Sequence, residues 1–240
     1  AMIFGTPTIP KTDKLFGPGN QYVMAAKQMA QKYGLAIDMP AGPSEVLVIA
    51  DQSANPAFVA ADLLSQAEHG PDSQTVLVSD SETLISEVEQ EVKNQIRNLP
   101  RKEIVLQALE NSLCILFDDI ADCVDFSNTY APEHLIVAAK NAELLSDKIT
   151  VAGSVFLGNW SCESAGDYAS GTNHTLPTNG YARNHSGLSL DSFVKKITFQ
   201  KLSEEGIRNL GPSIEMMAKA EQLQAHKNAV TLRLKALQDV

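Results

Sequence analysis

Long apolar runs and dense clusters of basic residues are both missing from this sequence of 240 residues. No uninterrupted apolar segment approaches the roughly 20 residues that a helix needs to cross a bilayer. Lysine and arginine together number 19 against 29 aspartate and glutamate residues, which gives a net charge of -10. An acidic chain without a basic cluster is not expected to bind nucleic acid or an anionic membrane surface, so a small-molecule ligand is the favoured partner.

Cysteine is scarce as well. The three cysteines, Cys114, Cys123 and Cys162, are odd in number and are not spaced like a metal-binding pair. They are predicted to be buried thiols of a protein from a reducing compartment. Because no secretory signal pattern opens the sequence either, a cytoplasmic location is expected.

The sequence does contain a regular alternation of apolar runs and helical segments. The predicted strands are 46–50, 75–78, 113–117, 135–137 and 154–157, and the predicted helical segments between the first three are 55–69 and 81–110. Continuous rather than alternating apolar residues indicate strands that are buried on both faces. An α/β fold is therefore predicted, with a mostly parallel sheet and with ligands near the carboxyl ends of its strands.

The helix predicted at 55–69 ends in two side chains of types that bind metals. Asn55 is suited to cap its first turn, and Pro56 occupies a position where no N–H group is needed. Gln66 and His69 are three residues apart and therefore share one helix face. Two interpretations stay open: half of a metal shell whose other ligands come from elsewhere, or a histidine at the negative end of the helix dipole beside a solvated glutamine.

Two further clusters combine acidic and imidazole side chains. Glu133 and His134 precede a predicted strand, and a bend there would let both face one site. The segment 166–178 is predicted to be a long glycine-bearing loop that contains Asp167 and His174. The alternative for this loop is an aspartate that stabilises a turn and a histidine that lies at the surface.

The start of the sequence contains a weaker signal. The glycine loop 17–20 runs into a helix predicted from Gln21, an arrangement that either binds a phosphate group or is a plain strand-to-helix turn. Residues 1–5 are typical of a helix that enters a turn, so we expect the sequence to be part of a longer polypeptide.

The end of the sequence departs from the α/β alternation. Residues 188–202 are predicted to form a strand, a turn and a second strand, and helices are predicted at 211–221 and from Gln224 onward. His226 begins the apolar stripe of the last helix, either as a functional group or as the edge of a packed face. Two such helices bury little surface by themselves, so this arm must pack on the main body or on another subunit.

Six segments resemble the histidinol dehydrogenase family, in the same order along the chain. They are KLFGPGN at 14–20, DMPAGPSE at 38–45, QAEHG at 66–70, APEHL at 131–135, GDYASGTNH at 166–174 and EQLQAH at 221–226. The resemblance covers the whole chain, and the segment 166–174 is the most specific of the six. The family has a comparably long amino-terminal portion that has no counterpart in this sequence.

The resemblance implies zinc-dependent oxidation of L-histidinol through L-histidinal to L-histidine, the last steps of histidine biosynthesis, with two NAD molecules reduced in succession. The zinc ligands that it implies are Gln66, His69, Asp167 and His226. The substrate contacts that it implies are Ser44, Gln66, His69, His134, Asp167, His174, Glu221 and His226. His134 would be the general base, Glu133 would activate water against the aldehyde, and Asn20 would contact NAD.

A Rossmann-like sheet and a homodimer are also implied, the latter with carboxyl-terminal helices that reach into the partner's site. The predicted division is 1–43, the end of a Rossmann-like domain whose start is missing; 44–188, an α/β domain for zinc and substrate; and 189–240, a strand and helix arm exchanged in the dimer. The family's other coenzyme contacts lie in the portion that is missing here, so autonomous activity is not expected.

Three alternatives stay open. A zinc hydrolase would use Glu133 or His134 to activate metal-bound water, although the sequence has no H-E-x-x-H motif. A fragment or subunit that binds zinc and histidinol would need its missing half supplied in trans. An α/β interaction module would bind no metal.

Overall fold

The computed structural model describes residues 1–17, 19, 21–40 and 42–238, and it consists of two compact units. The first unit is Ala1–Phe193 and the second is Val194–Val240. The division at residues 43 and 188 that the sequence suggests stays a prediction. No helix among these described residues is long and apolar enough to cross a membrane.

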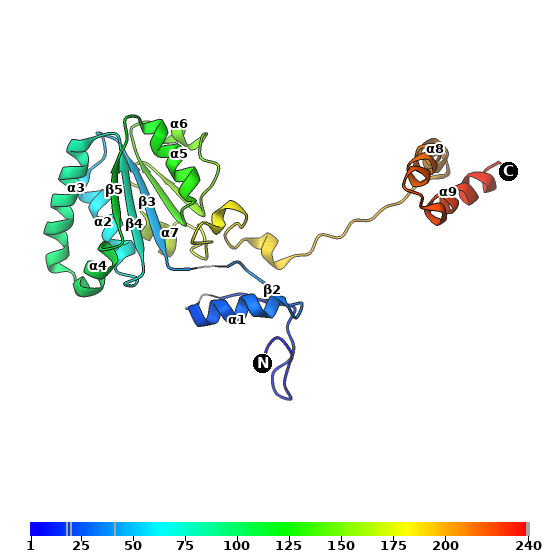
Figure 1. Ribbon diagram of the computed structural model, residues 1–240, viewed down its shortest axis with the longest axis horizontal. Helices are drawn as coiled ribbons and strands as arrows, with labels where there is room; N and C mark the ends of the chain where they lie inside the picture. Colours follow the sequence, from blue (N-terminus) through cyan, green and yellow to red (C-terminus); the bar gives the residue numbers. More distant parts are fainter. Residues whose placement is uncertain (18, 20, 41, 239–240) are drawn as a thin grey trace. The chain divides into compact units, whose positions relative to one another are not determined.

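The first unit is built on a five-stranded parallel sheet (Figure 1). Its strands are β3 (Glu45–Ala50), β4 (Gln74–Ser79), β5 (Leu113–Leu116), β6 (His134–Ala138) and β7 (Ser154–Leu157). The strand order is β5-β4-β3-β6-β7, so β3 is central, and Val46 lies opposite both Thr75 of β4 and His134 of β6. Every residue of β3 and β6 is buried, as the continuous apolar runs predict.

Helices cover both faces of this sheet (Figure 1). One face is covered by α2 (Pro56–Ala67), α3 (Glu82–Gln95) and α4 (Lys102–Leu109), and the other by α5 (Ile120–Tyr130) and α6 (Ala142–Ser146). Val46 and Val48 of β3 pack in the core beneath α2 and α3, whereas Leu47 and Ile49 pack beneath α5 and α6. The predicted α/β fold with a mostly parallel sheet is confirmed.

A smaller parallel sheet lies at the start of the first unit. It consists of β1 (Lys14–Leu15) and β2 (Ala36–Ile37), which are joined by α1 (Gln21–Gln31). Lys27 and Asp38 form a buried ion pair. Lys27 Nζ also donates to the Gly17 carbonyl at 2.8 Å, and the Gly17 N–H donates to Asp38 Oδ2 at 2.9 Å. This network fixes the beginning of the predicted glycine loop, whereas Asn20 lies outside the described residues.

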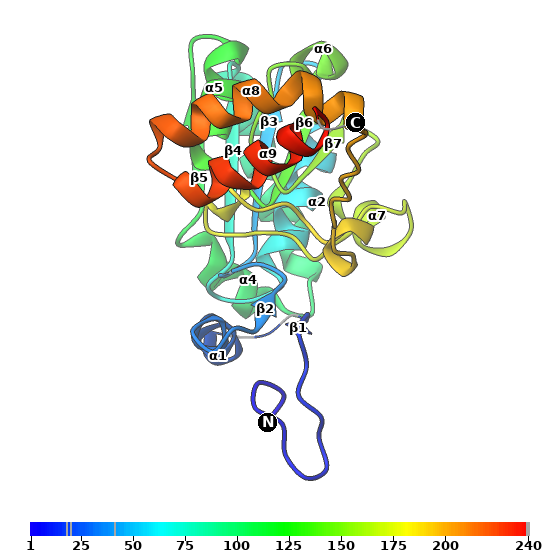
Figure 2. The ribbon, with the colours of Figure 1, turned by 90° about the vertical axis from the view of Figure 1, so that its right-hand side faces the viewer.

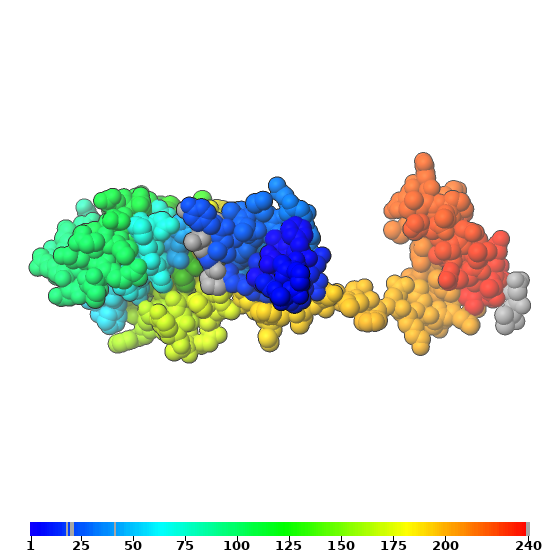
Figure 3. Space-filling model, turned by 90° about the horizontal axis from the view of Figure 1, so that it is seen from below, coloured from blue at the N-terminus to red at the C-terminus, as the bar shows by residue number. Residues whose placement is uncertain are grey.

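The second unit contains two helices, α8 (Glu204–Ala220) and α9 (Gln224–Ala236), which lie side by side (Figure 2). Figure 3 shows them, in orange and red, packed against each other. The close approach occurs at Gly211, where a Cβ atom would lie 2.8 Å from Leu234 Cδ1. The start of α9 agrees with the predicted helix from Gln224.

Two predictions for the tail are wrong. Residues 188–202 form no strand in the described structure, in which their backbone groups pair with no other strand as a stable strand requires; a 3-10 turn, η3 (Leu190–Phe193), precedes irregular chain. The helix α8 begins after its cap Ser203 rather than near Gly211, so Pro212 lies inside it. The capping hydroxyl and two acidic residues in the first turn outweigh the one hydrogen bond that proline removes.

The prediction of three buried thiols is wrong in part. Cys123 is buried, but Cys114 is exposed and Cys162 is partly exposed. Cys114 belongs to β5, which lies at the edge of the sheet and is therefore less covered than β3.

Candidate functional site

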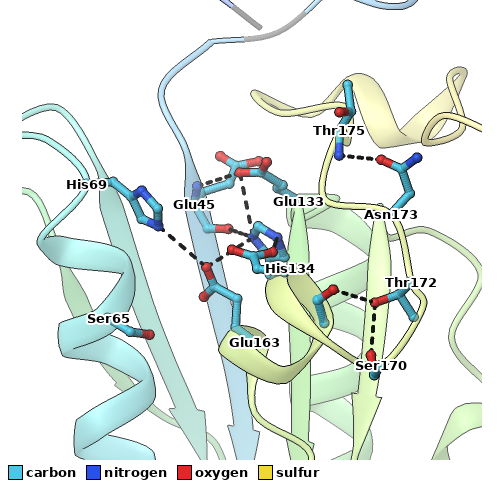
Figure 4. A network of polar contacts seen from close by, with 12 residues as sticks. Glu45, Ser65, His69, Glu133, His134, Glu163, Ser170, Thr172, Asn173 and Thr175 are labelled. Carbon is cyan, nitrogen blue, oxygen red and sulfur yellow. Dashed lines mark hydrogen bonds and ion pairs between the residues drawn. The ribbon is translucent and has the colours of Figure 1, made fainter. Parts of the chain in front are cut away.

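The predicted site residues of the first unit gather where the central strands begin. Ser44 directly precedes β3, and Glu133 directly precedes β6, whose first residue is His134. The expectation that ligands lie at the carboxyl ends of the strands is wrong for these residues. The helix α2 runs back from the end of β3, so Gln66 in its last turn and His69 after it return to the edge where β3 starts. Figure 4 shows His69 at this edge.

Gln66 is completely buried in the last turn of α2. Neither Nε2 nor Oε1 of its amide has a hydrogen-bond partner among the described residues. The interpretation of a solvated glutamine is therefore wrong. The predicted cap is confirmed, since Asn55 Oδ1 accepts a hydrogen bond from Ala57 N at 3.0 Å. Because an unpaired buried amide is costly, this side chain is suited to bind a group that enters the site.

Asp167 lies on a helix and not in a loop. The helix is α7 (Glu163–Tyr168), so the predicted glycine-bearing loop begins later than expected. Gly166 allows α7 to pack closely on β7, because a Cβ atom there would lie 2.5 Å from Phe156 Cε1. The helix also places Glu163 and Asp167 four residues apart, on one face.

One hydrogen bond fixes the ring of His134. Its Nδ1 lies 3.3 Å from the carbonyl oxygen of Glu45, which can only accept, so Nδ1 carries the proton. The other nitrogen, Nε2, is buried without a hydrogen-bond partner among the described residues and lies 3.9 Å from Asp167 Oδ1. Burial lowers the pKa of His134 to about 4, although Asp167 opposes this shift. The ring is therefore arranged to accept a proton at Nε2.

Glu133 is held beside this histidine. Its Oε2 accepts a hydrogen bond from the backbone N–H of Glu45 at 3.0 Å and lies 3.7 Å from His134 Nδ1. Burial raises the pKa of Glu133 to about 9; the Glu45 N–H opposes this rise, and the carboxylates of Glu163 and Asp167 add to it. A positive charge in the site would favour the ionised form of Glu133.

The patterns of the sequence do not single out Glu163, which belongs to the same cluster (Figure 4). Its Oε1 lies 3.9 Å from His69 Nε2 and 3.8 Å from His134 Nδ1. Its Oε2 is buried and has no hydrogen-bond partner in the part of the chain that is described. Burial, followed by Asp167 and Asp62, raises the pKa of Glu163 to about 8. The spacing of four residues from Asp167 is a signal only once this segment is known to be helical.

These side chains surround a cavity of about 240 Å³. Seven of the predicted site residues line it: Ser44, Gln66, His69, Glu133, His134, Asp167 and His174. Gly17 and Gly19 of the glycine loop line it as well. The structure therefore brings together residues from the glycine loop, α2, β6, α7 and the loop after α7.

The donors of this cavity fit a metal ion. Ligand atoms of His69, Glu163 and Asp167 lie within 4.8 Å of one another, and the amide oxygen of Gln66 lacks a partner among the described residues. Imidazole and carboxylate groups are zinc ligands. The ion pairs of this cluster in the described structure involve histidines and no lysine or arginine, so a bound cation would also balance its buried carboxylates.

The family model for histidinol dehydrogenase matches residues 1–234. The chain belongs to the histidinol dehydrogenase family. Histidinol dehydrogenase from Bacteroides thetaiotaomicron is 60% identical over 237 residues, which cover 99% of this chain and 55% of that protein. Histidinol dehydrogenase from Escherichia coli is 58% identical over 241 residues, with 100% of this chain and 56% of that protein covered. The family resemblance carried by the six sequence segments is confirmed.

A solved structure leads to the same family. The crystal structure of histidinol dehydrogenase from Elizabethkingia anophelis matches with a TM-score of 0.97 and 68% identity, and the match covers 99% of this chain and 55% of that one. The chain thus spans about half the length of the histidinol dehydrogenases that it matches.

Two residues with predicted roles in this histidinol dehydrogenase family site belong to the second unit. Glu221 is the C-cap of α8, and His226 lies in the first turn of α9. Both are exposed within that unit. Their roles as a substrate contact and a zinc ligand stay predictions, as does the NAD contact of Asn20.

Proposed function

We propose that this chain supplies the zinc and substrate site of a histidinol dehydrogenase that oxidises L-histidinol through L-histidinal to L-histidine and reduces two NAD molecules. The observation that supports it most is one cavity lined by both His134 and Gln66, whose Nε2 atom and side-chain amide, respectively, have no hydrogen-bond partner among the described residues. Family membership supports the identity of the substrate.

The residues that would hold zinc are Gln66, His69 and Asp167, whose amide, imidazole and carboxylate groups suit this metal. Bound zinc would act as a Lewis acid that binds the amino and imidazole nitrogens of histidinol and so places its alcohol carbon. Ser44 and His174, which line the same cavity, would contact the substrate.

His134 would act as the general base in the first oxidation. Its Nε2 would accept the hydroxyl proton while hydride passes from the adjacent carbon to NAD, which yields L-histidinal, NADH and one proton. The hydrogen bond from Nδ1 to the Glu45 carbonyl keeps the ring in the tautomer that this step requires.

Glu133 would act in the second oxidation. Its carboxylate would take a proton from the water molecule that adds to the aldehyde carbon, and protonated His134 would return its proton to the aldehyde oxygen, which gives the hydrate and leaves His134 free to act as a base again. The hydrate would then pass a second hydride to NAD and a hydroxyl proton to His134, which leaves L-histidine. The N–H of Glu45 holds the Glu133 carboxylate in place for this role.

The second unit would complete the site of another subunit. In a cytoplasmic homodimer, His226 would be the fourth zinc ligand of the partner's site, and Glu221 would bind the imidazole of the substrate. Asn20 would contact NAD. The family resemblance supports these three roles.

Formation of NADH tests the proposal directly. With zinc, NAD and L-histidinol, and with the amino-terminal portion of a histidinol dehydrogenase supplied in trans, the chain should form two NADH for each histidinol consumed. His134→Gln should lower turnover by about 10²-fold to 10⁴-fold, because it removes the base. His185→Gln is the matched control, since His185 is a histidine that does not line the described cavity, and it should leave turnover unchanged.

Two other outcomes would identify a different function. Hydrolysis of an ester or amide without NAD would indicate a zinc hydrolase that uses Glu133 or His134. Zinc-dependent binding of histidinol without NADH formation in that mixture would indicate a portion that binds zinc and histidinol but takes no part in the oxidation.

A further inference from the structure

Glu45 links the two proposed catalytic side chains through its backbone. It is the buried first residue of β3, the central strand of the sheet. Its N–H donates to Glu133 Oε2 at 3.0 Å, and its carbonyl oxygen accepts from His134 Nδ1 at 3.3 Å (Figure 4). A displacement of Glu45 would therefore move both groups.

The carboxylate of Glu45 binds the loop that follows α7. Its Oε1 accepts the backbone N–H of Asn179 at 3.0 Å. Burial raises the pKa of Glu45, and the backbones of Asn179 and Gly180 oppose this rise. Asn179 and Gly180 have φ angles of 54° and 74°, and successive N–H groups in such a turn can converge on one anion. Glu45 supplies that anion from within the chain.

The same loop forms a wall of the proposed substrate cavity. His174 and Thr175 line the cavity, and the loop is closed by a hydrogen bond of 3.0 Å from Leu188 N to the Thr175 carbonyl. A second attachment comes from the N–H of Gly42, which donates to Thr178 Oγ1. Gly42, in the segment before β3, and Glu45, the first residue of β3, thus attach the loop to the strand end at positions that follow His174 closely in the sequence.

The loop backbone provides the principal partners of this charge. Glu45 forms no ion pair with lysine or arginine among the described residues. Tyr130 Oη lies 3.4 Å from Glu45 Oε2, but it donates its single proton over the shorter distance of 2.6 Å to Gln74 Oε1. A buried carboxylate is costly, and burial raises the pKa of Glu45. The hydrogen bond from the loop therefore stabilises a charge that would otherwise be costly at this position.

We propose that Glu45 is a positioning residue that clamps the loop containing His174 onto the strand end that holds Glu133 and His134. The consequence for substrate binding rests on the proposed function, whereas the clamp itself does not. Glu45 would act through the loop and would not touch the substrate.

Hydrogen exchange and NMR of the chain without ligand test the clamp. Glu45→Met removes both carboxylate oxygens at similar side-chain length, and Glu45→Gln keeps one oxygen that accepts from Asn179. In Glu45→Met, amide exchange over residues 174–180 should accelerate by about tenfold or more, and the ring nitrogen signals of His174 should shift. In Glu45→Gln, the exchange rates and the His174 signals should both lie closer to those of wild type. Tyr130→Phe leaves the Asn179 bond intact and should change neither the exchange rates nor the His174 signals.

Two results would overturn the clamp: wild-type exchange in Glu45→Met, or the same acceleration in Glu45→Gln as in Glu45→Met. Circular dichroism and urea unfolding first establish that each variant folds. If Glu45→Met does not fold, Glu45→Asp replaces it, because Asp retains the charge and withdraws the oxygens by one methylene group. The same acceleration is expected in Glu45→Asp, and wild-type exchange in it would refute the proposal.

Kinetics separate failure of the clamp from failure of the proposed function. Where wild type oxidises L-histidinol, Glu45→Met should raise KM by about tenfold and change kcat by less than about threefold, because backbone groups still hold Glu133 and His134. A loss confined to kcat would contradict a role in the substrate wall. If wild type neither binds nor oxidises histidinol, the proposed function fails, and the exchange measurements still decide the clamp.

Discussion

Carboxyl groups with raised pKa values gather near the cavity. Burial is the main cause in Glu133, Glu163 and Asp62, whose pKa values are raised to about 9, about 8 and about 7. Asp62 lies on α2, one turn before Gln66, and it contributes to the raised pKa of Glu163. When folding raises the pKa of a carboxyl group, ionisation of that group destabilises the folded state. The fold is therefore more stable at a pH where these three groups carry a proton.

Asp62→Asn should remove part of the dependence of stability on pH. The pKa of Asp62 rises from its ordinary value of 3.8 to about 7 on folding, so its contribution is complete below about pH 4 and is lost as the pH rises through 7. For a partly exposed group, on the order of 2 kcal/mol of unfolding free energy should be lost between about pH 4 and pH 8. In Asp62→Asn, the loss of unfolding free energy over this pH range should be smaller than in wild type by about this amount.

Urea unfolding across this pH range measures the effect. Glu87→Gln, an exposed position on α3, is the matched control and should follow wild type. The same pH dependence in Asp62→Asn as in wild type would contradict the burial of the Asp62 carboxyl.

Individual elements explain why much of the site was predictable. The central strands were predictable because burial on both faces requires continuous apolar residues. The position of Gln66 and His69 followed from the signals at the start of α2, namely the cap Asn55 and the proline Pro56. The site residues on these elements line one cavity, which is what a shared site for a metal and a base would require.

The elements that were missed have weak or misleading local signals. The helix α7 has only 6 residues, its cap Cys162 makes no side-chain hydrogen bond, and it contains Gly166, so its sequence is typical of a loop. Glu163 was missed for this reason. Pro212 is typical of a helix start, whereas α8 begins at Glu204 because Ser203 caps the first turn of that helix.

The helix α9 leads to a prediction about the assembly. If His226 completes the zinc site of a partner subunit, mixing His69→Ala and His226→Ala chains should restore about one complete zinc site in each mixed dimer. In that dimer, one site contains both substitutions and the other contains neither. Zinc content after the chains are exchanged and dialysed measures the recovery.

The matched control is a mixture of Gln66→Ala with His69→Ala, two substitutions in the same unit. No mixed dimer of that pair has an unsubstituted zinc site, so zinc content should not recover. Equal zinc content in the two mixtures would contradict ligand exchange between subunits.

At the scale of the whole molecule, the predicted residues are divided between two units. The first unit gathers seven of them around one cavity, and the second contains Glu221 and His226. Sequence patterns cannot place two units relative to one another, because such placement depends on contacts between surfaces rather than on local periodicity. The chain also spans about half the length of its relatives, so NAD binding is a separate question from the binding of zinc and histidinol.

Calorimetric titration of L-histidinol into the zinc-loaded and the zinc-stripped chain tests the central claim most directly, namely that the described cavity is a zinc and histidinol site. We expect binding to the zinc-loaded chain and weaker binding, by about tenfold or more, to the stripped chain, because zinc would bind two nitrogens of the substrate. Equal affinity in both states, or no binding in either by a chain that circular dichroism shows to be folded, would contradict it.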